Sequence, residues 1–340
     1  MRIGIAHSAG KYSWPAVTTT QFTDGCNEIY SRGFRTLKVY CTSDYVANYP
    51  LHTWSSTPTS LKTLAQVTEY AAQLARTWHT VFMTCFTFAN GSTNWWRAQP
   101  LTSAFEAEYT EMYDLACHLL STYNGTGRRF VLQNWEGDWA FMDSFTVETH
   151  VDQKMVDRYV QFLGTRQRAV EAARRTTPSD CLVLHAVEAN RVVDARLKPH
   201  LRRICRDVFS RVRPDVVNYS AYDGTIVDQG GWGADLTAWT AATTPVFTKA
   251  LRTLKAAFPG VPLMIGEFGF PEGAELPVGR NVGDMINVVH AIALSEGVDT
   301  LIYWQVFDNE ETSPSVPRGF YIVKPDGSSS QASSALVALI

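Results

Sequence analysis

The feature that most constrains the fold is a regular alternation of short apolar segments with segments of helical periodicity. The alternation runs from the first residues to the last. Short runs rich in β-branched and aromatic residues are typical of buried strands, whereas apolar residues three or four positions apart are typical of amphipathic helices. The predicted strands are Arg2–Ala6, Thr36–Tyr40, Thr80–Phe86, Arg129–Trp135, Cys181–Val187, Val216–Ser220, Leu263–Phe268 and Thr300–Val306.

A predicted helix follows each predicted strand. These helices are Asp24–Ser31, Leu61–Arg76, Ser103–Tyr123, Asp152–Arg175, Pro199–Arg211, Pro245–Phe258, Val282–Glu296 and Ser333–Ile340. Strict alternation implies parallel strands with right-handed crossovers, and eight units in 340 residues fit a single (β/α)8 (TIM) barrel domain spanning residues 1–340. A doubly wound sheet is the alternative, but His7-Ser-Ala-Gly-Lys11 after the first strand lacks the Gly-x-Gly-x-x-Gly turn of dinucleotide-binding folds.

The composition excludes several classes of function. The chain is 45% hydrophobic and 19% charged, with a net charge of -3 and no basic block, so we expect no nucleic-acid partner. No apolar run is long enough to cross a membrane. The segment Met1–Ala6 is too short and too soon polar for a signal peptide, so we expect a mature or trimmed form. The six cysteines show no metal-ligand spacing, and we expect buried free thiols, no metal and a monomer.

In a barrel of this kind, the active site lies at the carboxyl ends of the strands. Glu267 lies near this end of the predicted strand Leu263–Phe268, and Glu136 follows the fourth strand. A buried carboxylate is costly unless it is paired or used. Two carboxylates across a barrel mouth are what glycoside hydrolysis requires, because one protonates the leaving oxygen and the other attacks or stabilises the sugar. Asp138 is an alternative acid.

Several segments resemble clan A of the retaining glycoside hydrolases, the group of barrels that contains cellulases, mannanases and β-glycosidases. They are Ile265-Gly-Glu-Phe-Gly269, Asn134 close to Glu136, a tyrosine after the sixth strand, Tyr303-Trp304, Gly33-Phe-Arg-Thr-Leu-Lys-Val39 and the closing segment Gly319–Gly327. The resemblance spans the whole chain in order. It implies a retaining β-glycoside hydrolase that acts on an oligo- or polysaccharide without a cofactor, and such a substrate implies secretion.

The resemblance also implies residue roles. Glu267 would be the nucleophile and Glu136 the general acid/base, with carboxyl groups about 5–5.5 Å apart as retention requires. The implied substrate-site residues are Asn134 for the sugar 2-hydroxyl, Trp304 for the floor of the sugar site, and Tyr219 or Tyr222 for a hydrogen bond to the nucleophile.

Two positions depart from the clan. Asn and Glu are normally adjacent after the fourth strand, whereas Trp135 separates Asn134 from Glu136 here. Strict alternation would place both on one face, so either a bulge at Trp135 restores the usual orientation or Asn134 has another role. Lys38 stands where the clan has Arg, which keeps the positive charge without the bidentate fork. We expect Lys38 to lower the pKa of Glu267.

Other residues near strand ends are candidates for substrate binding. His185 and Glu188 are three residues apart on the fifth strand, so they point to opposite faces and at most one enters the site. Asp308 belongs to an expected hydrogen-bonding loop after the eighth strand, and Trp135 is a further candidate beside Glu136. Aromatic side chains in the upper loops predict an extended polysaccharide cleft, and they are Trp54, Trp95, Trp96, Trp139 and Trp232.

Two other classes of function remain open at this point. A non-catalytic carbohydrate-binding barrel would keep the aromatic loops without needing both Glu136 and Glu267. A barrel aldolase would use Lys38 as a Schiff-base amine, which the two facing carboxylates disfavour.

Overall fold

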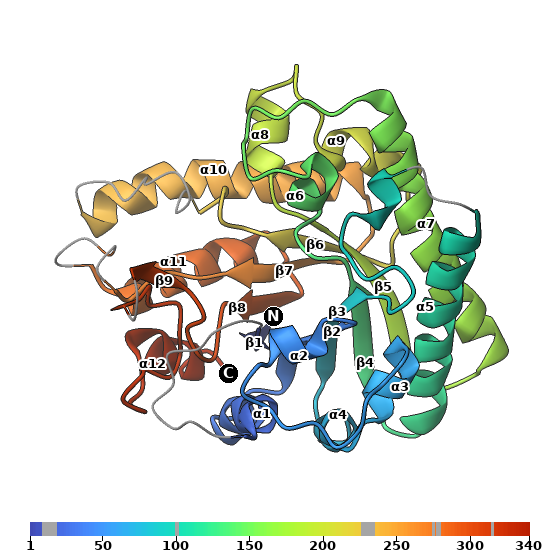
Figure 1. Cartoon of the computed structure of the whole chain (residues 1–340). Helices are drawn as coiled ribbons and strands as arrows, with labels where there is room; N and C mark the ends of the chain where they lie inside the picture. Colours follow the sequence, from blue (N-terminus) through green and yellow to red (C-terminus); the bar gives the residue numbers. More distant parts are fainter. Residues whose placement is uncertain (9–18, 99–101, 226–234, 274–275, 277–279, 314–315) are drawn as a thin grey trace.

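A computed structural model of the chain confirms the (β/α)8 barrel (Figure 1). It describes residues 1–8, 19–98, 102–225, 235–273, 276, 280–313 and 316–340. Among these residues, eight parallel strands close the barrel in chain order, and the last pairs with the first. The strands are β1 (Arg2–His7), β2 (Thr36–Thr42), β3 (Thr80–Phe86), β4 (Arg129–Gln133), β5 (Leu182–Ala189), β6 (Val216–Ser220), β7 (Leu263–Phe268) and β8 (Thr300–Tyr303).

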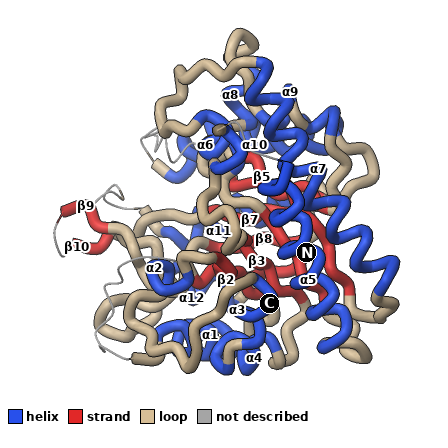
Figure 2. Tube along the Cα trace, turned by 45° about the vertical axis from the view of Figure 1, so that its right-hand side comes forward, coloured by secondary structure: helices blue, strands red, loops and turns tan. Residues whose placement is uncertain are grey.

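Helices surround the barrel on its outside, as the tube view shows (Figure 2). They are α1 (Gln21–Ser31), α2 (Tyr45–Asn48), α3 (Leu61–Gln66), α4 (Thr68–Leu74), α5 (Thr102–Thr122), α6 (Gly137–Met142), α7 (Gln153–Thr176), α8 (Val192–Leu197), α9 (Ile204–Asp207), α10 (Leu236–Ala257), α11 (Val282–Ser295) and α12 (Gln331–Val337). Two 3-10 turns (Trp95–Arg97 and Phe209–Arg211) and a pair of short strands, β9 (Glu311–Ser313) and β10 (Val316–Pro317), complete the described elements.

Three predicted helices differ from the structure. The predicted helix Leu61–Arg76 is divided into α3 and α4, because Val67 leaves the helical conformation (φ -56°, ψ 137°). The predicted helix Pro199–Arg211 is reduced to α9 and a 3-10 turn, since Arg203 has an extended backbone. Pro245 lies inside α10 rather than at its start, because the helix begins earlier in the chain, where Asp235 caps its N-terminus.

The packing explains why the strands are apolar on both faces. Strand side chains alternate between the barrel interior and the surrounding helices, and both sides are covered. On the outside, buried residues of α7 such as Tyr159 and Leu163 belong to the hydrophobic core. The interior at the carboxyl end is polar instead, with buried side chains of Lys38, Gln133, Glu188, Asn218 and Glu267.

A buried ion pair links α5 and α7. Glu108 Oε1 accepts a hydrogen bond from Arg166 Nε at 2.7 Å, and Glu108 Oε2 accepts one from the Thr87 hydroxyl at 2.7 Å. Arg166 also donates to the backbone carbonyl of Cys85 at 2.8 Å, so the pair fixes the carboxyl end of β3. Both charges are hydrogen-bonded, which offsets the cost of burying them.

Short elements form a lobe beside the carboxyl end of the barrel. In Figure 1, α6, α8 and α9 lie together at the top of the view, in the connections that follow β4 and β5. The β9–β10 pair follows β8. These connections supply most of the side chains of the site described below.

The cysteines are free thiols, as predicted. Five of the six are buried, and Cys117 on α5 is partly exposed. No helix in the described part of the chain is long and apolar enough to cross a membrane.

Candidate active site

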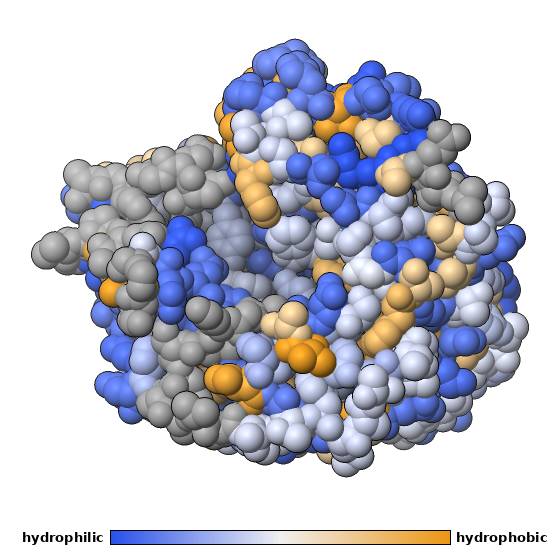
Figure 3. Space-filling model, viewed as in Figure 1, coloured by the Kyte–Doolittle hydropathy of each residue, from blue (hydrophilic) through white to orange (hydrophobic). Residues whose placement is uncertain are grey.

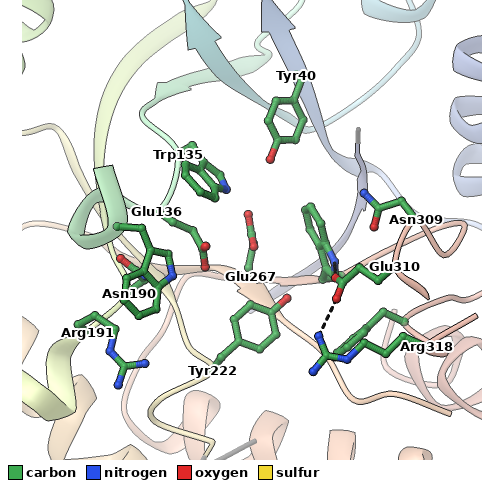
Figure 4. Close-up of a pocket in the computed structure, with 13 residues that line it drawn as sticks. Tyr40, Trp135, Glu136, Asn190, Arg191, Tyr222, Glu267, Asn309, Glu310 and Arg318 are labelled. Atoms are coloured by element: carbon green, nitrogen blue, oxygen red, sulfur yellow. Dashed lines mark hydrogen bonds and ion pairs between the residues drawn. The ribbon is translucent and has the colours of Figure 1, made fainter. Parts of the chain in front are cut away.

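A cavity of about 390 Å³ opens at the carboxyl ends of the strands, where the sequence predicts the active site. The space-filling view shows this face hollowed beside the lobe of α6, α8 and α9 (Figure 3). Polar and aromatic side chains share its walls (Figure 4). The lining residues are Tyr40, Trp135, Glu136, Trp139, Asn190, Arg191, Tyr222, Glu267, Trp304, Asn309, Glu310, Arg318 and Phe320.

Glu267 is buried at the end of β7 and lines the cavity. Its Oε1 atom accepts a hydrogen bond from Lys38 Nζ at 2.7 Å, which makes a buried ion pair. Burial raises the pKa of Glu267 to about 7; Lys38 acts in the predicted direction and lowers this pKa, but burial outweighs it. Glu267 therefore ionises near neutral pH, and its carboxylate is then held beside a cation.

Lys38 lies on β2 with its ammonium group inside the barrel. Nζ also donates to Glu188 Oε1 at 3.1 Å and to the carbonyl of Gly266 at 3.1 Å. Burial alone would lower the pKa of Lys38, but Glu188 and Glu267 raise it above its usual value. A Schiff-base lysine needs a neutral, accessible amine. Lys38 is charged and does not line the cavity, so the structure favours the ion pair with Glu267 over both substrate binding and the aldolase alternative.

Glu136 follows β4 and points into the same cavity as Glu267 (Figure 4). Ser220 Oγ donates to its Oε1 at 2.6 Å. Burial raises the pKa of Glu136 well above the usual value of 4.5, the negative charge of Glu267 raises it further, and the Ser220 hydrogen bond lowers it. The two carboxyl groups have unequal surroundings, since Glu267 has an ammonium partner and Glu136 has a hydroxyl. This inequality favours the proton on Glu136 and the charge on Glu267.

Asn134 does not line the cavity, contrary to the sugar contact that its position implies. β4 ends at Gln133, so strand alternation does not continue to Glu136. The Asn134 side chain accepts a hydrogen bond from the N–H of Glu188 at 3.0 Å and donates to the Glu188 carbonyl at 3.2 Å. Asn134 therefore fastens the end of β4 to β5, while Trp135 and Glu136 turn into the cavity.

Of the two candidate tyrosines, Tyr222 lines the cavity and Tyr219 does not. Tyr219 is fully buried on β6, packs against Phe247 of α10 and donates its hydroxyl to Asp223. Alternation along β6 explains the difference, because Tyr219 precedes the inward-facing Ser220 and must point outward.

Tyr40 is a site residue that sequence reasoning missed. It lies two positions beyond Lys38 on β2, so both side chains point to the interior. The phenol groups of Tyr40 and Tyr222 point into the cavity that contains Glu267 (Figure 4). Burial raises both phenol pKa values, and the charge of Glu267 raises them further. Both tyrosines are therefore neutral hydroxyl donors.

His185 points away from the cavity, so it is not placed for the predicted substrate contact. It lies opposite Glu188 on β5, as predicted, and Glu188 is the residue that enters the interior. The Nδ1 atom of His185 forms a hydrogen bond with Gln167 Oε1 on α7 at 3.0 Å. Burial lowers the pKa of His185 to about 3, so the ring is neutral.

Asp138, the alternative acid, anchors a loop instead. It is fully buried and does not line the cavity. Its oxygens accept the backbone N–H groups of Asn190 and Arg191, each at 3.0 Å, and of Ile204 at 2.9 Å. Burial raises the pKa of Asp138, and these backbone donors lower it. Asp138 is not placed to protonate a leaving group.

Asp308 has a similar anchoring role after β8. It accepts the backbone N–H of Glu310 at 3.0 Å and that of Gly319. Burial raises the pKa of Asp308 to about 6. Asp308 does not line the cavity, so it is not placed for the predicted substrate contact, but it positions Asn309 and Glu310, which do line it.

Three of the predicted tryptophans line the cavity. Trp304 donates its Nε1–H to Glu310 Oε1 at 3.1 Å, which fixes the indole that the sequence assigns to the sugar floor. Trp135 and Trp139 lie on the β4 side, and Phe145 packs beside both, with ring centroids 6.3 and 5.6 Å away. Phe145 is 74% exposed, so this aromatic strip continues from the cavity to the molecular surface.

The other tryptophans do not form an extended cleft. Trp54 packs against Tyr70 near β2, and Trp95 and Trp96 pack against Phe162 of α7. They are not placed for the predicted sugar contacts, because these rings fill the spaces between loops and helices. Trp232 lies outside the described residues.

Loop residues form the rest of the cavity wall, and no local pattern in the sequence signals them. Arg318 Nη1 donates to Glu310 Oε2 at 2.7 Å, and Arg191 lies over the Trp139 ring at 5.0 Å. Asn190 and Asn309 add amide groups. Within the described ranges, no group of side chains could hold a metal ion.

Known structures share this fold. A GH5_18 structure from Bifidobacterium longum subsp. infantis has a TM-score of 0.64 at 14% identity, over 100% of this chain and 78% of the other. A Streptomyces cattleya GH5_18 structure with GlcNAc has a TM-score of 0.61 at 13% identity, over 99% and 79%. The GH1 β-glucosidase of Exiguobacterium antarcticum B7 has a TM-score of 0.60 at 11% identity, over 99% and 96%.

These similarities show that the chain has the (β/α)8-barrel fold of the matched GH5 and GH1 structures. No known family matches the sequence, and no curated protein sequence matches it. At 11–14% identity the similarity concerns the fold, and the activity is argued from the site.

Proposed function

We propose that this protein is a retaining β-glycoside hydrolase that acts on an oligo- or polysaccharide. The observation that carries the proposal is the pair of Glu136 and Glu267, two carboxyl groups with unequal surroundings that line one cavity of a clan A barrel. Retaining hydrolysis needs this inequality, since one group must deliver a proton while the other attacks as an anion.

In the first step, Glu136 gives its proton to the glycosidic oxygen while Glu267 attacks the anomeric carbon. The bond to the leaving group breaks, and a covalent glycosyl-enzyme forms. Glu267 is then a neutral ester, so the charge that favoured the proton on Glu136 is gone and the pKa of Glu136 falls. In the second step, the ionised Glu136 takes a proton from water, and the water releases Glu267.

The surrounding side chains suit these roles. Lys38 holds Glu267 by an ion pair, and Tyr40 and Tyr222 present hydroxyl donors toward it. Trp304 offers a flat apolar surface against which the face of a sugar ring can lie.

The aromatic strip supports a substrate longer than one sugar. Trp135, Trp139 and Phe145 lead from the cavity beside the proposed acid to the surface, and neighbouring aromatic rings of this kind offer flat apolar surfaces for successive sugar rings. The sugar in the Streptomyces cattleya structure supports a carbohydrate ligand for this fold. Because polysaccharides occur outside cells, we also propose that the protein acts there.

The test is a screen for hydrolysis of plant, fungal and bacterial glycans, with the anomeric configuration of the first product followed by NMR. We expect wild type to hydrolyse at least one β-linked glycan with retention and Glu267→Gln to be inactive. Glu106→Gln, at an exposed position on α5, is the matched control and should behave as wild type.

Each contrary result has a specific meaning. Equal hydrolysis by wild type and Glu267→Gln would refute the nucleophile assignment, and an inverted product would refute the double displacement. If wild type hydrolyses no glycan, yet wild type and Glu267→Gln bind the same glycan equally, the protein is a non-catalytic carbohydrate-binding barrel.

A further inference from the structure

Glu188 is a third buried carboxylate at the carboxyl end of the barrel. It lies near the end of β5, is fully buried and does not line the cavity. Its two oxygens have separate partners. The contacts of these oxygens lead to the two proposed catalytic carboxyl groups by different routes.

The first oxygen is connected to the nucleophile. Glu188 Oε1 accepts hydrogen bonds from Lys38 Nζ at 3.1 Å and from Gln133 Nε2 at 3.0 Å. The same ammonium group donates to Glu267 Oε1 at 2.7 Å. Glu188 and Glu267 therefore share one cation, and the position of Lys38 depends on both.

The second oxygen is connected to the acid. Glu188 Oε2 accepts the backbone N–H of Glu136 at 2.8 Å. The backbone of Glu188 is itself bonded on both sides to the Asn134 amide, which fixes the end of β4 against β5. The chain turns toward the cavity at this point, so the hydrogen bond sets where the Glu136 side chain begins.

We infer that Glu188 is a positioning residue that couples the nucleophile and the acid/base through one carboxylate. The inference rests on the proposed function. The hydrogen bonds to its side-chain oxygens, including one from Asn218 Nδ2 at 3.4 Å, all come from donors, so the residue acts as a carboxylate with both oxygens as acceptors. Its negative charge also faces both catalytic groups and raises the pKa of each.

Other charged or titratable groups surround the site, but their contacts differ. They are Lys38 and Tyr40 on β2, Arg191 after β5, Tyr222 after β6, and Glu310 and Arg318 after β8. In the described part of the chain, Glu188 is the residue that is bonded both to the cation beside Glu267 and to the backbone of Glu136.

The decisive variant is Glu188→Gln, which keeps the shape but has one acceptor oxygen. An amide oxygen can face either the Lys38 ammonium or the N–H of Glu136, and the amide NH2 would then face the other donor. We expect kcat to fall about 100-fold with little change in KM, because the reacting groups shift while the cavity wall stays intact. We also expect both limbs of the pH profile of kcat/KM to move about 1 unit toward acid, because a negative charge has been removed.

Two further variants distinguish a loss of the coupling through Glu188 from a general loss of protein stability. Glu188→Asp keeps the charge but shortens the side chain, so kcat should fall while the limbs of the pH profile stay near their wild-type positions. Glu108→Gln is the matched control, since Glu108 is equally buried and paired with Arg166 but touches neither catalytic group. The Glu108→Gln variant should have a lower unfolding temperature, but neither limb of its pH profile of kcat/KM should move. A shift of both limbs in Glu108→Gln as large as in Glu188→Gln would overturn the inference.

A measurement without turnover keeps this inference separate from the proposed function. Carbon-13 NMR of labelled glutamate carboxyl groups gives the titrations of Glu136 and Glu267, assigned with their Gln variants. We expect both to titrate at lower pH in Glu188→Gln. If the shift occurs and no glycan is hydrolysed, the coupling stands and the proposed function fails. If hydrolysis is retained and Glu188→Gln leaves kcat, the limbs and the titrations unchanged, the coupling fails and the proposed function stands.

Discussion

The ammonium group of Lys38 and the carboxylate of Glu267 lie 2.7 Å apart, although they come from β2 and β7, which are not neighbours in the barrel. The side chains are only 1% and 3% exposed. Removing one partner of such a pair leaves an uncompensated buried charge. The polar interior therefore depends on one cation shared by Glu188 and Glu267.

We expect Lys38→Met to lower the free energy of unfolding by about 3–5 kcal/mol at neutral pH, because two carboxylates would lose their shared cation. The loss should be smaller at acidic pH, where Glu267 takes up a proton. Urea unfolding at the two pH values measures both effects. Lys249→Met, at an exposed position on α10, is the control and should change stability by less than about 0.5 kcal/mol. Wild-type stability in Lys38→Met would contradict the ion pair.

The pH profile of kcat/KM should be bell-shaped. Glu267 must be ionised, and burial raises its pKa to about 7, so activity should fall as the pH drops below about 7. Glu136 must carry a proton, and its pKa is raised above 4.5, so activity should fall again as the pH rises through that raised value. Initial rates on a soluble substrate give both limbs. An acidic limb near 4.5, the usual value for glutamate, would show that burial does not control Glu267.

Glu136→Gln should lower activity, whereas Asp138→Asn should lower stability. Glu136→Gln removes the proposed acid, so kcat/KM, which reports the first step, should fall about 10²–10⁴-fold on a natural glycoside and much less on a dinitrophenyl glycoside, whose leaving group needs no proton. Asp138→Asn weakens an anchor of three backbone N–H groups, so the free energy of unfolding should fall by about 1–3 kcal/mol. Rates on both substrates, together with urea unfolding, separate the two. A leaving-group dependence in Asp138→Asn alone would reverse the assignment.

Phe145→Ala should weaken binding of long substrates only. Loss of one aromatic contact of about 1 kcal/mol raises KM about fivefold for an oligosaccharide, without affecting an aryl monosaccharide. Stability should not change, since Phe145 is 74% exposed. Leu294→Ala, at another exposed apolar position on α11, is the control. An equal KM increase on both substrates would place Phe145 at the sugar in the cavity rather than beyond it.

Sequence periodicity was sufficient to predict the barrel and the charged residues at the carboxyl ends of its strands. The alternation of segments predicts the strand order, and the rule that sites lie at strand ends finds Glu136, Glu267 and Trp304, all of which line the cavity. Lys38 and Tyr40 face the interior together, because they are two residues apart on one strand. The same rule reaches Tyr40, although sequence reasoning assigned this residue no role.

The direction of a side chain beyond a strand end could not be found in this way. Asn134 turns to β5 because β4 stops at Gln133, and a sequence pattern gives such a boundary only within a few residues. The sequence predicted that at most one of His185 and Glu188 faces the interior. It did not identify Glu188 as a partner of Lys38, because that contact joins positions far apart in the chain. The tryptophans in loops such as Trp96 proved to be packing residues, because composition does not distinguish a packed ring from an exposed one.

The distribution of buried and exposed cysteines has a practical consequence for labelling the protein. Five thiols are buried, and Cys117 on α5 is partly exposed, on a helix that contributes nothing to the cavity. The native chain thus offers one position for a thiol-reactive dye without any prior mutation. A fluorophore at Cys117 would report on the folding of the protein while leaving the face with the cavity unmodified.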